Sequence, residues 1–84
     1  MSSSQKLIDR LRSIPSDFTW NELVKALAHF GYIERKTGKT GGSRRKFSDS
    51  DNNLIILHKP HPSNIIKKYA LKQIIETLQE KGRI

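Results

Sequence analysis

Residues 32–58, YIERKTGKTGGSRRKFSDSDNNLIILH, decide the fold of this 84-residue chain. They contain three short runs typical of strands, at 32–37, 43–48 and 54–58. The first two runs are separated by a Gly-rich segment, and the last two by five residues of Asp, Ser and Asn. Strand-like runs bounded by such turn residues are typical of β-hairpins. We therefore predict a three-stranded antiparallel meander.

Two helices are predicted before the strands. The first carries four apolar residues at the spacing of one helix face, namely Leu7, Ile8, Leu11 and Ile14. Pro15 follows and is expected to end this helix. The second should begin at Thr19, whose side chain can form a capping box with Glu22, and end before Gly31.

A last helix is predicted from about Lys67, because Pro60 and Pro62 prevent further strand pairing. Its apolar face repeats at helical spacing over Leu71, Ile74, Ile75 and Leu78. The chain is thus predicted to be an α+β protein: helix, three-stranded antiparallel sheet, helix, with an extra N-terminal helix. Residues 1–16 would form a helical extension and residues 17–84 one domain, with the helices on one sheet face and the other face open.

The composition limits the classes of function. Sixteen Lys and Arg against eight Asp and Glu give a net charge of +8, and there is no cysteine. A basic balance of this size on a small domain favours a polyanionic partner, nucleic acid before membrane. A chain this short is not expected to enclose a deep cofactor cleft. We therefore expect that it needs no cofactor. No apolar run is long enough for a membrane span, so we expect a soluble, cytoplasmic protein.

Positive charge gathers in the first hairpin. Six cations and no acid lie between positions 35 and 46: Arg35, Lys36, Lys39, Arg44, Arg45 and Lys46. Glycines in the intervening turn allow close approach of the backbone to an anion, and the cationic heads can neutralise phosphates. The alternative is an ordinary hairpin turn that needs glycine and is flanked by solvated charge.

A second basic run, Lys67-Lys68-Tyr69-Ala70-Leu71-Lys72, opens the last predicted helix. It resembles the Lys-Lys-x-Ala-x-Lys run of double-stranded RNA-binding domains, whose helix, three strands, helix order is also predicted here from Thr19 onward. In that family the run grips phosphates, which implies the same role for Lys67 and Lys68. The alternative is an ordinary solvated helix face.

Two histidines, His58 and His61, lie on either side of Lys59-Pro60, where the third strand leaves the sheet. An imidazole held beside cations is suited to general acid–base cleavage of a phosphodiester. Packing of the loop is the alternative for His61, and a structural or surface role is expected for His29. Two histidines without cysteine do not make a zinc site, so no metal is expected.

Together these residues resemble the HicA type of mRNA interferase toxin, a small basic family paired with an antitoxin called HicB. The resemblance covers Thr19 to Ile84. It rests on Leu23-Val24 to Gly31-Tyr32, Gly42-Ser43 with a cation-rich strand ending in Phe47, the pair His61-Pro62, and the helix from Leu71 to Gly82. The family carries its catalytic histidine in a Gly-Ser-His strand motif. Here that motif reads Gly42-Ser43-Arg44.

The replacement of histidine by Arg44 changes the expected chemistry. A guanidinium stays protonated and cannot take a proton from a ribose 2′-hydroxyl, although it can stabilise charge on a phosphorane. If Ser48 pairs opposite Leu54, then Arg44 falls opposite His58 on one sheet face. His61 matches the family and His58 has the better expected geometry, so either is a candidate for moving protons.

The sequence therefore predicts an mRNA endoribonuclease toxin, neutralised by a HicB-type antitoxin, with catalytic candidates Arg44, His61 and His58. The residues expected to bind RNA are Lys36, Lys39, Arg44, Arg45, Lys46, Lys59, Lys67 and Lys68. One alternative is a non-catalytic RNA-binding module of the same fold. A weaker one is a winged or helix-turn-helix DNA-binding domain, although the last helix offers few groups for base readout.

Overall fold

The structure, a computed structural model, describes residues 3–35 and 44–84. It contains, in order, α1 (Ser3–Arg12), α2 (Trp20–His29), β1 (Ile33–Arg35), β2 (Arg44–Ser48), β3 (Leu54–His58) and α3 (Lys68–Glu80). The predicted α+β order, with its extra N-terminal helix, is confirmed. None of the helices in the two described ranges is long and apolar enough to cross a membrane.

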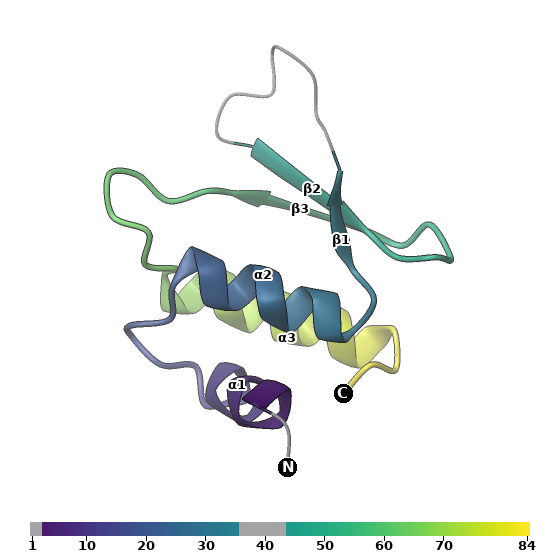
Figure 1. Cartoon of the computed structure of the whole chain (residues 1–84), viewed down its shortest axis with the longest axis horizontal. Coiled ribbons are helices and arrows are strands. Elements are labelled where there is room, and N and C mark those ends of the chain that lie inside the picture. Colours follow the sequence, from purple (N-terminus) through teal and green to yellow (C-terminus); the bar gives the residue numbers. More distant parts are fainter. Residues whose placement is uncertain (1–2, 36–43) are drawn as a thin grey trace.

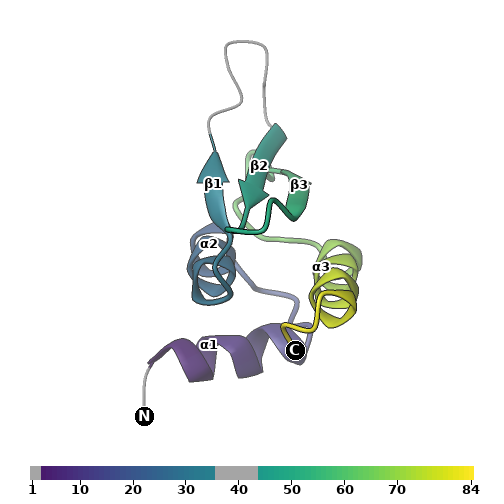
Figure 2. The ribbon, with the colours of Figure 1, turned by 90° about the vertical axis from the view of Figure 1, so that its right-hand side faces the viewer.

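The elements form three layers (Figures 1 and 2). The sheet lies on top, α2 and α3 lie side by side beneath it, and α1 lies below both helices (Figure 2). A sheet with helices on one face must bury that face and leave the other to solvent or a ligand.

The sheet order is β1-β2-β3, and both pairings are antiparallel. Phe47 lies opposite Ile55, and both side chains are buried toward the helices. Because side chains alternate along a strand, the intervening positions face away. Three large apolar residues on this open face are about half exposed: Ile33, Leu54 and Ile56. The open sheet face is thus confirmed.

The helix ends follow the predicted signals with one exception. The Thr19 side chain accepts from the backbone N–H of Glu22, and the Glu22 side chain accepts from that of Thr19, so the capping box is present. Gly31 has φ 88°, as expected of the residue that ends a helix. The prediction that Ile14 continues α1 is wrong: the helix ends at Arg12, and Ile14 has φ 51°.

The apolar face of α1 is buried on the rest of the chain. Leu11 is fully buried and Ile8 nearly so, in one hydrophobic cluster with residues of α2, the sheet and α3. Arg10 also forms an ion pair with Glu22, the acidic member of the α2 capping box. The four apolar residues of the N-terminal segment therefore have a partner within the chain, while the division at residue 16 stays a prediction.

Candidate functional site

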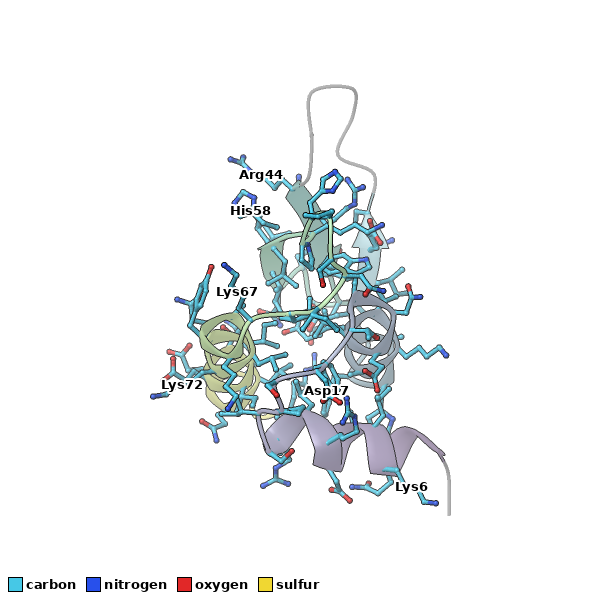
Figure 3. The ribbon with its side chains drawn as sticks, turned by 90° about the vertical axis from the view of Figure 1, so that its left-hand side faces the viewer. Lys6, Asp17, Arg44, His58, Lys67 and Lys72 are labelled. Atoms are coloured by element: carbon cyan, nitrogen blue, oxygen red, sulfur yellow. The ribbon has the colours of Figure 1, made fainter. Side chains whose placement is uncertain are left out.

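Arg44 and His58 lie directly opposite each other at one end of the sheet, at the start of β2 and the end of β3. The predicted register, with Ser48 opposite Leu54, is confirmed. Directly opposite residues on an antiparallel pair have Cβ atoms about 5 Å apart on the same face. Both side chains are exposed, and Figure 3 shows them together at one corner of the molecule. A fixed cation and an imidazole thus share one site.

The loop that follows His58 is held against the start of α2. Thr19 and Ile65 form an isolated β-bridge. The backbone N–H of Trp20 donates to the carbonyl of Asn64 over 2.7 Å, and that of Ile66 donates to Phe18 over 2.7 Å. These bonds fix the far end of the loop and bring it back beneath the sheet toward α3.

A hollow of about 300 Å³ lies between the end of β3, this loop and the start of α3. Its lining includes both candidate histidines, His58 and His61, together with Lys59 and Lys67. The structure thus brings together four of the predicted site residues, and Arg44 adjoins them through His58. Two imidazoles and two ammonium groups around one hollow can bind a phosphate and move protons near it.

The three consecutive cationic side chains of β2 do not all lie on the same face of the sheet. Lys46 lies two residues beyond Arg44 and therefore on the same open face, opposite Ile56. Arg45 lies on the helix-facing side, opposite Leu57, and its Nε is 3.4 Å from a carboxylate oxygen of Glu34. Of these three predicted RNA-binding residues, Arg44 and Lys46 therefore share the open face, whereas Arg45 lies on the other face.

The remaining predicted RNA-binding residues fall into two groups. Lys67 and Lys68 are exposed at the start of α3, and Lys67 lines the hollow beside His58. In Figure 3, Arg44, His58, Lys67 and Lys72 follow one another down the same side of the molecule. Lys36 and Lys39 lie outside the described residues.

Two residues of this region were not among the predicted site residues. Arg35 lies opposite Lys46 on the open face, and its Nε donates to the Ser48 hydroxyl over 2.8 Å. Tyr69 lines the hollow and is 65% exposed. An aromatic ring inside a lysine run was the available signal for Tyr69, because nucleic-acid surfaces combine basic grooves with stacking rings.

The described part of the chain contains no cluster of side chains suited to binding a metal ion. Across residues 3–35 and 44–84, no three His, Asp or Glu side chains gather as candidate ligands. The third histidine, His29, lies at the end of α2 with its ring edge-on to Phe30. It does not line the hollow, so it offers a natural control for the other two.

One of three comparisons with known proteins identifies a family. A family model described as HicA toxin of bacterial toxin-antitoxin matches residues 20–79. The comparisons with curated proteins and with solved structures gave no match. The matched range holds α2, the sheet with His58, the following loop with His61 and nearly all of α3. The chain therefore belongs to the HicA family of bacterial toxin–antitoxin toxins.

Proposed function

We propose that this HicA-family toxin is an endoribonuclease that cleaves mRNA in the cytoplasm. The observation that carries the proposal is the cross-strand pair of Arg44 and His58 beside a hollow that His61 also lines. The open sheet face around the pair is shallow and cationic. A shallow site suits a long, flexible substrate that passes across it.

The reaction is an attack of the ribose 2′-oxygen on the adjacent phosphorus. One imidazole takes the 2′-hydroxyl proton as the 2′-O–P bond forms, and the other gives a proton to the 5′-oxygen as the P–O5′ bond breaks. The products are a 2′,3′-cyclic phosphate and a 5′-hydroxyl. His58 is assigned as the base because it stands opposite Arg44, and His61 as the acid because it lines the same hollow.

Arg44 supplies electrostatic stabilisation. Negative charge builds on the non-bridging oxygens as phosphorus becomes five-coordinate, and a fixed guanidinium can donate two hydrogen bonds to them. The family's histidine at this position implies a proton-transfer role there. In this chain that role passes to the neighbouring strand, where His58 stands opposite.

Purified protein incubated with single-stranded RNA in the presence of EDTA tests the proposal. We expect fragments that end in a 2′,3′-cyclic phosphate and begin with a 5′-hydroxyl, identified by mass spectrometry. Arg44→Ala, His58→Ala and His61→Ala should each lower the cleavage rate by about 100-fold or more. His29→Ala is the matched control and should cleave like the wild type.

Two results would overturn these assignments. If His58→Ala and His61→Ala both cleave at the wild-type rate and keep the wild-type melting temperature, neither histidine transfers a proton in the reaction. Cleavage that disappears with further purification of the wild type indicates a contaminating nuclease and removes the activity itself.

The alternative is an RNA-binding module without catalysis, and the Gly42-Ser43-Arg44 motif favours it. Under this alternative the wild type binds RNA with a steep salt dependence and yields no fragments. Arg44→His would then create cleavage by restoring the family's histidine. Under the main proposal the wild type already cleaves, so the two proposals give opposite results with wild-type protein.

The proposed antitoxin is of the HicB type and covers the open sheet face. The exposed apolar residues Ile33, Leu54 and Ile56 share this face with Arg44 and Lys46, so a partner could bind apolar and cationic groups together. Co-expression with the protein encoded next to the toxin gene should relieve growth arrest. Leu54→Ala, at the end of β3 away from His58, should weaken that complex while leaving RNA cleavage intact, because it adds no charge to the cationic face.

A further inference from the structure

Tyr69 lies between two hollows that run along the edge where β3 meets α3. The first is the 300 Å³ hollow beside His58 and Lys67. The second, of about 130 Å³, is lined by Ile56, His58, Tyr69 and Gln73, among others. Both hollows share His58 and Tyr69, so they adjoin each other near the Arg44–His58 pair, and the two hollows together are called the groove.

The side chain of Tyr69 is largely exposed to solvent, which is unusual for a large aromatic residue. Tyr69 is 65% exposed and takes part in none of the ring contacts found within residues 3–35 and 44–84. Its helix neighbours Leu71 and Ile74 supply the buried face of α3, so Tyr69 is not needed to fill the core. A large exposed ring in a basic groove suits stacking of a planar ligand.

The rest of the groove matches a nucleotide in chemistry. Its floor includes the buried Ile66 and the half-buried Ala70, against which a base can lie. The exposed Gln73 amide can donate and accept hydrogen bonds at a base edge. Lys67 supplies an ammonium group to the hollow that His58 and His61 also line, where a phosphate would stand.

We infer that this groove, the Tyr69 groove, binds one unpaired nucleotide next to the cleaved phosphate, with its base stacked on Tyr69. The inference rests on the proposed ribonuclease function and adds to it the residue that holds a base, since a base within a duplex is not free to stack on a side chain. Lys67 neutralises the backbone of this nucleotide, and Gln73 contacts its base edge. Binding at this groove therefore requires an unpaired base at that position.

Binding and cleavage are measured separately to test this inference. Short single-stranded RNA with 2′-O-methyl groups throughout has no 2′-hydroxyl nucleophile, so it reports binding by the full chain without cleavage. The base of each position is removed in turn, leaving an abasic site. For the wild type we expect one position at which base removal weakens binding by about tenfold.

The Tyr69 variants connect that position to the groove. Tyr69→Ala should bind the intact RNA about tenfold more weakly and lose the effect of the abasic site. Tyr69→Phe keeps the ring and should behave like the wild type. His29→Ala removes an exposed ring at the end of α2, outside the groove, and should also leave binding unchanged.

The inference fails if Tyr69→Ala binds like the wild type, or if its abasic effect persists. It also fails if duplex RNA binds as tightly as single-stranded RNA and Tyr69→Ala affects neither. Cleavage of unmodified RNA is scored independently. A protein that shows the Tyr69-dependent abasic effect but yields no fragments supports the groove and contradicts the proposed catalysis.

Discussion

The carboxylate of Asp49, in the turn between β2 and β3, accepts a hydrogen bond from the guanidinium of Arg83 near the C-terminus. Asp49 is buried, at 3% exposure. The Asn53 side-chain amide, together with the backbone N–H groups of Asn53 and Asp51 and with Arg83, lowers the pKa of Asp49 to about 2 against the opposing effect of burial. One carboxylate thus ties the second hairpin to the end of the chain.

This pKa predicts loss of stability in acid. A carboxyl whose pKa is lower in the folded state stabilises the fold above its unfolded pKa of 3.8, and this contribution disappears as the pH falls toward about 2. The melting temperature of the wild type should therefore drop across this window. Asp49→Asn should have a melting temperature several degrees lower at neutral pH, and that temperature should fall less steeply than the wild type's as the pH drops from about 4 to about 2. If the melting temperatures of the two proteins fell in parallel with pH, the stabilising role of the Asp49 carboxylate would be refuted.

The turn residues and the alternation of side chains along the sequence predicted the hairpin, but they did not predict its contact with Arg83. The five-residue turn after Ser48 sets the register, and from it the Arg44–His58 pairing follows. Strand alternation also places Arg45 with Phe47 on the helix side, which the predicted RNA-binding role of Arg45 does not take into account. The Asp49–Arg83 contact joins positions 34 residues apart, and no local pattern specifies it.

The Tyr69 groove could not be predicted for a related reason. Its walls come from β3, α3 and the loop between them, and their relative placement depends on how the helix packs beneath the sheet. The bridge between Thr19 and Ile65 fixes the connecting loop, and it pairs residues far apart in the chain. Residue types alone indicated an RNA-binding surface, whereas the hollow shared by His58 and Tyr69 required the tertiary structure.

The division of β2 between two faces predicts unequal contributions to RNA binding. Lys46→Gln removes a cation from the open face and should reduce the slope of log affinity against log salt by about 0.7, the value for one phosphate of a single strand. Arg45→Gln is the matched control: Arg45 pairs with Glu34 on the other face, so the slope should change little. Titrations at several salt concentrations measure both. Equal losses would show that both cations contact RNA.

The capping box predicts a measurable local contribution to stability. Thr19→Ala removes the hydroxyl that accepts from the Glu22 backbone N–H over 3.2 Å, and should lower the free energy of unfolding by about 1 kcal/mol. Thr77→Ala is the control. Thr77 donates to the Gln73 carbonyl within α3, an interaction that adds little to a helix. Urea denaturation compares the two variants, and a larger loss for Thr77→Ala would contradict the capping role.

The burial of α1 predicts that the N-terminal segment is part of the folding unit, although the family match begins at residue 20. Leu11 is fully buried between α1 and the rest of the core, so Leu11→Ala should lower the free energy of unfolding by about 2–5 kcal/mol. Leu54→Ala, at a leucine that is 50% exposed, should change it by no more than about 0.5 kcal/mol. Both variants should unfold in one cooperative transition, monitored by circular dichroism in urea. If Leu11→Ala were as stable as Leu54→Ala, α1 would be an appendage whose apolar face contributes nothing to the stability of the domain.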